Sequence, residues 1–313
     1  MLKLGSDCAI IGSGFGIYGY LPALLKCGQE IVMPVRYRHV VTKRFPKIAE
    51  SPQVGWARDE LSAIQSARGV ILAVNPARQE NWIKVCLEEP RLEHLCLEKP
   101  LARNPSIARE VHKLLCLSGK SFSLGYLFRY TKWYQVLARL ASNQKDGGQI
   151  AVRWKFRSNH YQNQLRNWKS DPSQGGGALR FYGIQIIACL AELGYERSLD
   201  SKTIGLGPGD AHLWKARFAG TNLADVDVEI DSNSKASTFG LFVRRRGMSR
   251  QMVSWRTPFQ ENFRPTGLCG TDPRVEHLVT LCQAREPASV RKSIYLRTLD
   301  LWDNVELVNQ HLI

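Results

Sequence analysis

The chain has no closely spaced cysteine pair. Its eight cysteines, at positions 8, 27, 86, 96, 116, 189, 269 and 282, include no CxxC spacing and lie mostly in apolar surroundings. This pattern disfavours a disulfide framework or a cysteine-based metal site and is typical of reduced core residues. The amino terminus lacks a basic-then-apolar signal stretch, and no apolar run approaches a membrane span. We therefore expect a cytoplasmic protein with no metal and no membrane partner.

Acidic residues are few relative to basic ones. The chain has 43 Lys and Arg against 28 Asp and Glu, a net charge of +15 and a pI near 9.6. This balance favours an anionic partner, such as a dinucleotide phosphate, an acidic or nucleotide-linked sugar, or nucleic acid. A generally basic, solvated surface explains the balance equally well. The basic residues are dispersed and form no known nucleic-acid motif, so we do not expect nucleic-acid binding.

Hydrophobic patterning divides the 313 residues into two parts. In the first, expected strands at 7–11, 31–35 and 69–74 alternate with helices, including one over 20–26. Such alternation predicts a parallel, doubly wound sheet. We place this first domain at residues 1–124.

The second part changes period. Apolar residues alternate with basic ones over 152–157 and with acidic ones over 226–231, which is the pattern of half-buried strands. This favours an open, mainly antiparallel sheet covered by helices on one face. We place this second, α+β domain at residues 125–313. If the two strands are neighbours, their opposite charges are expected to meet across the sheet.

Three motifs follow one another along the chain. Residues 8–16 (CAIIGSGFG) form a strand running into a glycine-rich turn, Glu98-Lys99-Pro100 follows an expected buried strand, and residues 175–179 read GGGAL. This order resembles the glucose-fructose oxidoreductase/inositol dehydrogenase (Gfo/Idh/MocA) family over nearly the whole chain. The resemblance implies a Rossmann-type α/β domain followed by an α+β domain, hydride transfer between a nicotinamide and a sugar or cyclitol, and a homo-oligomer, most simply a dimer.

The glycine turn is the first candidate site. Gly12 and Gly14 occupy the first two positions of a GxGxxG fingerprint, but the third position holds Ile17. We expect Gly12, Ser13, Gly14 and Phe15 to hold a dinucleotide pyrophosphate at a helix amino terminus. A tight turn that binds nothing is the alternative.

The residues at the end of the second strand indicate which dinucleotide the chain binds. Where an acidic residue contacts the ribose of NAD, this chain has Arg36, with Arg38 two residues on. A guanidinium there suits a 2′-phosphate, so we expect NADP, with NAD as the alternative cofactor. A solvated surface arginine is the competing interpretation. By resemblance, Asn75 and Pro76 line the adenosine and nicotinamide side of the crevice, although an ordinary turn is equally compatible with the sequence.

Lys99 is the candidate acid or base. It follows a strand at the sheet edge where ligands bind, and a lysine in such a crevice can lose enough solvation to exchange protons near neutral pH. We expect Lys99 to contact substrate, and Glu98 and Lys99 to line the cofactor site. The alternative is an ion pair between Glu98 and Lys99 at a strand end.

The third motif departs from the family pattern. Relatives carry an aspartate four residues after the last glycine and a histidine four residues later; this chain has Phe181 and Gln185 there. The usual histidine acid/base is therefore missing. Either Lys99 acts alone or another group has replaced the histidine, with Tyr182 as the first candidate and His160 and Tyr161 as further ones. A packing or surface role is the alternative for each of the three.

Other residues are candidates for substrate contact. By resemblance, Arg129 lies near the substrate, although a hydrogen-bond donor that links the two domains explains it equally well. Trp168, in a loop that by resemblance covers the active site, offers a flat face to a sugar ring. Gln185 can only hydrogen-bond. Arg180 is the only charge in an apolar helical stretch, so it needs an acidic partner or an anionic ligand.

Three functions fit these residues. The leading one is an NAD(P)-dependent oxidoreductase of a sugar, nucleotide-sugar or cyclitol derivative, with an anionic substrate favoured by the basic loops. The second is a cofactor-binding protein that has lost catalysis, suggested by Phe181 and Gln185. The third is a glycosidase-like use of tightly held NAD, against which Arg36 counts.

Overall fold

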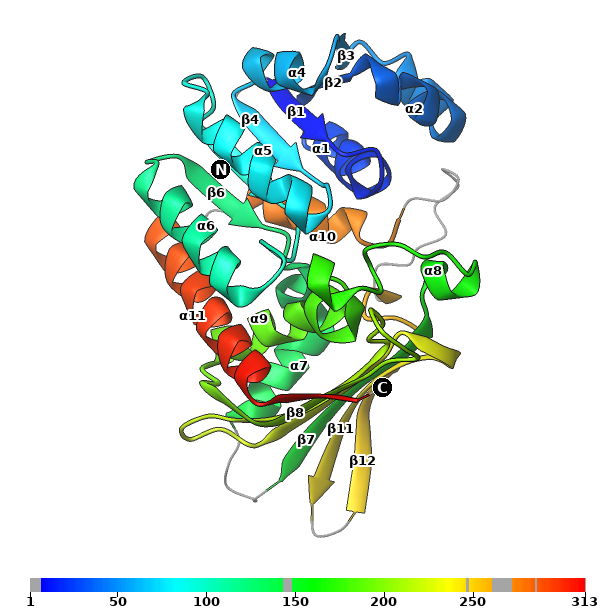
Figure 1. Ribbon diagram of the computed structural model, residues 1–313, viewed down its shortest axis with the longest axis vertical. Coiled ribbons are helices and arrows are strands. Elements are labelled where there is room, and N and C mark those ends of the chain that lie inside the picture. Colours follow the sequence, from blue (N-terminus) through cyan, green and yellow to red (C-terminus); the bar gives the residue numbers. More distant parts are fainter. Residues whose placement is uncertain (1–6, 143–147, 246–247, 261–271, 285, 313) are drawn as a thin grey trace. The chain divides into compact units, whose positions relative to one another are not determined.

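The computed structural model describes residues 7–142, 148–245, 248–260, 272–284 and 286–312 (Figure 1). They form two compact units. The first comprises the described residues of Met1–Leu101, Glu110–Leu127 and Asn262–Arg291, and the second those of Ala102–Arg109, Phe128–Glu261 and Lys292–Ile313. Helix α10 (Val275–Gln283) therefore belongs to the first unit although it lies near the carboxyl end of the sequence.

The first unit is built on a parallel sheet of six strands in the order β3-β2-β1-β4-β5-β6. This is the Rossmann-type doubly wound sheet that the sequence predicts. Strands β4 and β5 are buried at all four positions, because helices cover both faces of such a sheet. The strands are β1 (Asp7–Ile11), β2 (Glu30–Pro34), β3 (Val54–Ala57), β4 (Gly69–Leu72), β5 (His94–Leu97) and β6 (Ser121–Leu124).

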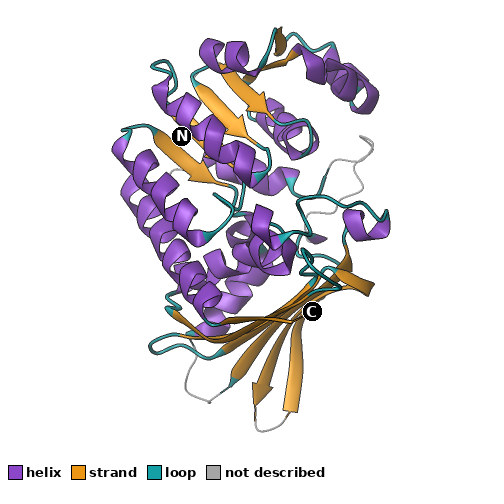
Figure 2. Cartoon of the chain, viewed as in Figure 1, coloured by secondary structure: helices purple, strands orange, loops and turns teal. Residues whose placement is uncertain are grey.

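Helices alternate with these strands (Figure 2). They are α1 (Leu21–Lys26), α2 (Arg38–Arg44), α3 (Pro46–Ala49), α4 (Glu60–Ser66), α5 (Pro76–Glu88) and α6 (Pro105–Leu117). The strand order reverses between β1 and β4, and in open α/β sheets ligands bind in the crevice beyond the carboxyl ends of the strands at that reversal. The glycine turn, Asn75 and Lys99 follow β1, β4 and β5, so all three lie at this edge.

The second unit contains a seven-stranded sheet in the order β12-β11-β7-β10-β9-β8-β13. Two neighbouring pairs, β7 with β10 and β8 with β13, are parallel, and the other four are antiparallel. The prediction of a mainly antiparallel sheet is confirmed. The strands are β7 (Gln149–Arg157), β8 (Arg197–Ile204), β9 (Leu213–Ala219), β10 (Val226–Asp231), β11 (Asn233–Arg245), β12 (Met248–Trp255) and β13 (Asn309–Leu312).

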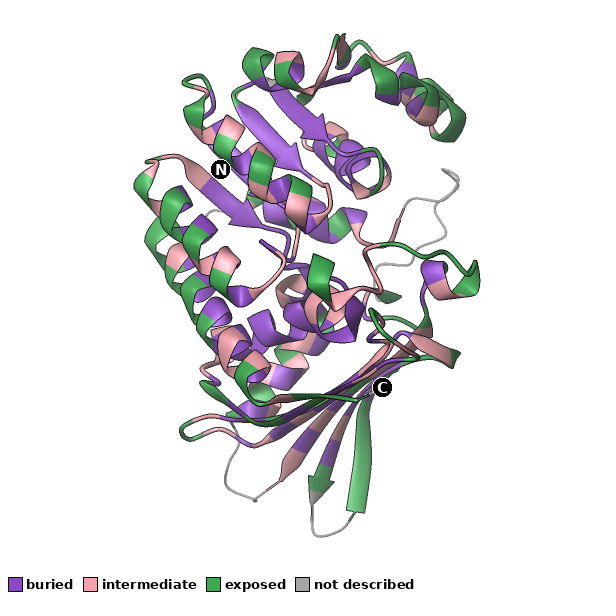
Figure 3. Ribbon diagram, viewed as in Figure 1, coloured by how far each residue is buried: buried purple, intermediate pink, exposed green. Residues whose placement is uncertain are grey.

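The two faces of this sheet differ. In β10, buried and half-buried residues alternate, and β12 is largely exposed (Figure 3). On the polar face, Lys155 of β7 pairs with Glu229 of β10 at 3.0 Å, and Arg217 of β9 pairs with Asp227 of β10 at 2.8 Å. The basic strand β7 and the acidic strand β10 are therefore neighbours. Glu229 is neutralised from β7, whereas Asp227 is neutralised by Arg217 of β9.

Helical segments pack on the other face. A π-helical segment, η6 (Ala178–Gly183), contacts β9 and β10 and continues into α9 (Ile184–Leu193). A Cβ on Gly183 would lie 2.7 Å from the Trp214 ring, so glycine permits this close packing. The other helices are α7 (Lys132–Ala141), α8 (Asn159–Gln162) and α11 (Ala288–Leu307). Within the described residues, no helix is both long and apolar enough to cross a membrane.

Candidate active site

The two glycines of the turn after β1 serve different purposes. Gly12 has a φ of 132°, and a Cβ there would collide with the carbonyl oxygen of Ala73 at the end of β4. Gly12 is therefore required by the fold. At Gly14 a Cβ would meet no described residue within 4 Å, and both Ser13 and Gly14 are exposed. The backbone at Gly14 thus borders open space, which is what a bound pyrophosphate needs.

The departure at the third position of the fingerprint has a structural explanation. Ile17 is only 1% exposed and belongs to the core. Its neighbour Gly16 makes the close approach to the sheet instead, since a Cβ there would lie 2.9 Å from Cγ2 of Ile10. The turn then continues as a π-helix, η1 (Gly16–Tyr20), before α1 begins. The shifted glycine therefore preserves the strand-to-helix turn.

The loop carrying Lys99 is held by one buried glutamine. Gln79 of α5 is 1% exposed; its amide nitrogen donates to the carbonyl oxygens of Glu98 (2.7 Å), Pro100 (3.2 Å) and Leu101 (3.2 Å). Its amide oxygen accepts from the backbone N–H of Glu98 at 3.1 Å. The Lys99–Pro100 peptide bond is cis. The backbone on both sides of Lys99 is thus fixed, and nothing in the sequence around Gln79 signals this role.

Glu98 lies in a polar cluster beneath the same loop. Tyr20, which is fully buried, donates its hydroxyl to Oε1 of Glu98 at 2.8 Å. A Cβ on Gly125 would lie 2.7 Å from that oxygen, so a glycine is needed there. Burial raises the pKa of Glu98, whereas the charges of Lys99 and Arg274 act in the opposite direction. Glu98 is therefore a buried carboxyl group shared by an aromatic hydroxyl and two cations.

Arg274 was not anticipated from the sequence. It precedes α10 and makes a two-pronged ion pair with Asp272, with N–O distances of 2.7 and 2.6 Å. Its guanidinium lies 4.2 Å from the ring centroid of Phe15 in the glycine turn. A segment near the carboxyl end therefore contributes a cation to this edge of the sheet, and only tertiary structure reveals it.

The residues expected at the adenosine end are also placed. Arg36 follows β2 in a short 3₁₀ segment, η2 (Val35–Tyr37), and forms an ion pair with Glu60, the first residue of α4. The guanidinium of Arg38 lies 5.9 Å from the ring of Trp56. Asn75 caps α5 by accepting the N–H of Arg78 at 2.9 Å, and Pro76 occupies the first turn. Asn75 is thus a helix cap at the ligand-binding edge.

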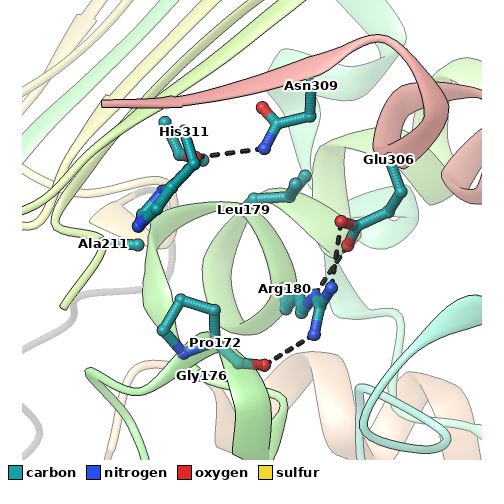
Figure 4. A pocket seen from close by; sticks show the side chains of 9 residues that line it. Pro172, Gly176, Leu179, Arg180, Ala211, Glu306, Asn309 and His311 are labelled. Atoms are coloured by element: carbon teal, nitrogen blue, oxygen red, sulfur yellow. Dashed lines mark hydrogen bonds and ion pairs between the residues drawn. The ribbon is translucent and has the colours of Figure 1, made fainter. Parts of the chain in front are cut away.

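In the second unit, both candidate arginines have carboxylate partners. Arg129 pairs with Glu192 at 2.6 Å. Arg180 makes two bonds to Glu306, at 2.7 and 3.0 Å, and donates to the carbonyl oxygen of Pro172 at 2.6 Å (Figure 4). Of the two partners expected for Arg180, an acidic residue or an anionic ligand, the structure supplies the acidic residue.

This ion pair lines a pocket of about 160 Å³ within the second unit (Figure 4). Asn309 and His311 of β13 lie on its opposite side, where each hydrogen-bonds the hydroxyl of Thr203, at 3.0 and 2.9 Å. The polar groups that line the pocket therefore bond largely to one another.

Of the two positions where relatives carry the aspartate and the histidine, one holds an apolar side chain and the other a side chain that is hydrogen-bonded to the backbone. Gln185 is 5% exposed, and its side-chain oxygen accepts the backbone N–H of Phe128 at 3.4 Å. Phe181 stands edge-on to Trp168, with ring centroids 5.1 Å apart, and to Tyr182 at 4.7 Å. Tyr182 in turn stands edge-on to two half-buried rings of β7, which stack on each other at 4.4 Å. We call these five rings the aromatic wall: Trp154, Phe156, Trp168, Phe181 and Tyr182.

A polar cluster lies in the same unit. The Tyr161 hydroxyl bonds to Asp210, which also contacts Nδ1 of His212 at 3.2 Å. His160 is 3% exposed; burial, with the nearby charge of Lys169, lowers its pKa to about 4. His160 is therefore neutral near pH 7. No group of three or more His, Cys, Asp or Glu side chains among the described residues could hold a metal ion.

Comparison with known proteins shows the fold. No family model and no curated protein sequence matches the chain. Solved structures match over almost its whole length. A 3-ketoreductase from Actinomadura kijaniata, in complex with NADP and TDP-benzene, is 13% identical with a TM-score of 0.69, covering 98% of both chains.

Two further structures show the range of this fold. The WlbA dehydrogenase from Bordetella pertussis, in complex with NADH and UDP-GlcNAcA, is 12% identical with a TM-score of 0.67, covering 96% of both chains. A biliverdin reductase from Synechocystis sp. PCC 6803, in complex with biliverdin and NADP+, is 14% identical with a TM-score of 0.63, covering 97% of this chain and 99% of that chain. The fold implied by the sequence resemblance is confirmed.

Proposed function

We propose that the chain is an NAD(P)-dependent oxidoreductase that transfers hydride between a nicotinamide and a carbon of a sugar, nucleotide-sugar or cyclitol derivative. The observation that carries this proposal is the position of Lys99 after β5, at the carboxyl edge of a Rossmann-type sheet, in a loop whose backbone on either side of Lys99 is bonded by Gln79. The complexes with TDP-benzene and UDP-GlcNAcA on the same fold support a nucleotide-sugar substrate. The fold alone does not select the substrate.

The cofactor would be held by the turn at Gly12, Ser13, Gly14 and Phe15, with its ribose near Arg36. Further contacts would come from Arg38, Asn75, Pro76, Glu98 and Lys99. The open space beside Gly14 fits a pyrophosphate, because none of the described residues would meet a Cβ there. When bound, the nicotinamide supplies or accepts the hydride.

Lys99 would hold the oxygen of the carbon that exchanges hydride and would give or take its proton. Tyr182, whose ring is part of the aromatic wall, is the second candidate for this proton transfer. Variants of the ketoreductase with lysine changed to alanine and tyrosine changed to phenylalanine have also been solved on this fold. A lysine and a tyrosine are therefore a reasonable pair to test.

On the substrate side we propose direct contact by Trp168 and Lys99. We assign Arg129 and Arg180 supporting roles, because Glu192 and Glu306 already neutralise them. Gln185 would act through the backbone of Phe128.

Location in the cytoplasm remains part of the proposal; the seven cysteines within the described residues are all free thiols, as a reducing compartment requires.

The aromatic wall favours a second candidate substrate. Five half-buried rings in mutual contact, with Phe181 at the position of the family's aspartate, suit a planar ring system as well as a sugar face. The complex with biliverdin shows that one protein of this fold binds a ligand that is not a sugar. We therefore include biliverdin and planar carbonyl compounds among the substrates to be tested.

The direct test is turnover with reduced and oxidised cofactors against nucleotide-linked keto sugars, cyclitols and planar compounds. Lys99→Ala should lower turnover by about 100-fold or more with little change in cofactor affinity. Lys26→Ala, a surface change at the Glu276 ion pair, is the matched control. Full turnover by Lys99→Ala would remove Lys99 as the acid or base. Cofactor binding without turnover on any substrate would favour the noncatalytic alternative, and substrate cleavage without net cofactor consumption would favour the glycosidase-like one.

A further inference from the structure

A carboxylate lies where the sequence suggests only cations. Glu60 begins α4 directly after Asp59, the residue that caps this helix. Its side chain is 12% exposed and pairs with Arg36, whose side chain is 55% exposed. The sequence around Arg36 does not reveal this carboxylate, because Glu60 comes from a separate element.

Tyr37 connects this pair to the glycine turn. Its hydroxyl accepts the backbone N–H of Gly12 at 3.2 Å and donates to Oε1 of Glu60 at 3.1 Å. Arg36 also donates to the Tyr37 hydroxyl, at 3.3 Å. Because Tyr37 is only 4% exposed, this short chain of bonds fixes the Glu60 carboxylate beside the turn. Glu60 and Arg36 thus occupy the corner between the ends of β1 and β2.

The two side chains retain bonding capacity of opposite kinds. Both recorded bonds to Glu60, from Arg36 and Tyr37, go to the same oxygen, Oε1, so within the described part of the chain Oε2 can accept another donor. Both bonds that Arg36 makes to described residues use Nη2, and its side chain is 55% exposed, so its other guanidinium N–H groups can donate to a ligand. The corner therefore offers an acceptor and a set of donors side by side.

A free ribose and a phosphorylated one respond to this corner differently. A 2′-hydroxyl can donate to a carboxylate, which is the usual role of an acidic residue near this position in NAD sites. A 2′-phosphate needs the guanidinium and is repelled by a carboxylate beside it. Since Glu60 is mostly buried, its charge is poorly screened.

We propose that Glu60 determines the nicotinamide cofactor preference of this chain: it accepts the free ribose of NAD(H) and, by holding Arg36, weakens binding of the 2′-phosphate of NADP(H). This inference rests on the proposed function. With Glu60 in place, both cofactors bind with similar affinity, and removing its charge converts the site to one that prefers NADPH.

The test is fluorescence titration of the purified full chain with NADPH and NADH. For Glu60→Gln, the ratio of the NADH to the NADPH dissociation constant should rise by about tenfold or more, because NADPH binds tighter and NADH weaker. Glu93→Gln, which removes an exposed carboxylate paired with Arg68 in the same unit, should leave the ratio unchanged. Arg36→Ala should weaken NADPH binding alone.

Three results would overturn the proposal. An affinity ratio within twofold of the parent's in folded Glu60→Gln would show that Glu60 does not discriminate. If Glu60→Gln does not fold, Glu60→Asp is the second variant, because it keeps the charge but moves it back by one methylene. An unchanged ratio of the NADH and NADPH dissociation constants in Glu60→Asp would count equally against the proposal. Failure of both cofactors to bind the folded parent chain would reject the proposed function as well, so the two failures are distinguishable.

Discussion

At the scale of single residues, the candidate site depends on side chains that come from separate segments. Lys99 and the glycine turn are recognisable because short motifs carry them. Gln79, Glu60 and Arg274 are not, because their roles arise only when α5, α4 and the segment before α10 meet the same sheet edge. A glutamine inside a helix carries no local signal of the loop it supports.

Two buried histidines should make stability depend on pH. Burial lowers the pKa of His160 to about 4 and that of His94 to about 3, both below the usual value of about 6.5. Below about pH 6.5 the unfolded chain therefore binds more protons than the folded one. We expect the histidines' contribution to the free energy of unfolding to be complete above pH 6.5 and to be lost as the pH drops toward 4. His160 should contribute up to about 3 kcal/mol.

Urea denaturation between pH 7.5 and 4 measures this effect. His160→Gln should flatten the slope over that interval, because one of the two histidines no longer titrates. A slope that is the same in the parent and the variant would show that His160 is not buried as a neutral group.

At the scale of elements, the helices and strands follow their sequence patterns more closely than the site does. The alternation over 152–157 and 226–231 predicts β7 and β10 correctly, since a two-residue period has one structural meaning. The apolar stretch after the glycine triplet is helical, but it begins as the π-helix η6. Periodicity cannot distinguish a π-helix from an α-helix over one turn, so the directions of Phe181 and Tyr182 could not be predicted.

The surroundings of α9 make a specific prediction for Gln185→His, the change that restores the family's histidine. Gln185 is buried and bonded to the amide of Phe128, so an imidazole there would face that amide instead of a reacting group. Turnover should therefore not rise, and the free energy of unfolding should fall by about 1 to 3 kcal/mol. Turnover assays and urea denaturation check both parts. A tenfold gain in turnover would show that the site had only lost its histidine.

At the scale of the whole molecule, the sequence predicts two architectures correctly because each has its own period and its own motifs. Assignment of the carboxyl-terminal helices is harder. Helix α10 joins the unit that contains the glycine turn, and contacts between residues so distant in sequence leave no periodic signal. The net charge of +15 does not by itself show whether the excess of basic residues serves a cofactor, a substrate or only a solvated surface.

The polar face of the seven-stranded sheet bears on assembly. Its ion pairs, including Lys155 with Glu229 and Arg217 with Asp227, present a structured surface that a second copy could match. We expect a homodimer. Light scattering at low and high salt measures the mass, and salt should weaken the assembly if these charges lie at the interface. A monomer under both conditions would contradict this prediction.

The proposed function requires that the turn after β1 bind a nicotinamide dinucleotide. The most direct measurement is NADPH and NADH titration of Gly14→Val beside the parent chain, with thermal melting as the control for folding. Because a Cβ at Gly14 meets none of the residues that the structure describes within 4 Å, valine should leave the melting temperature nearly unchanged while filling the space proposed for the pyrophosphate. Both cofactors should bind at least tenfold more weakly to this variant than to the parent. Unchanged affinity in a fully folded Gly14→Val protein would contradict the proposed function.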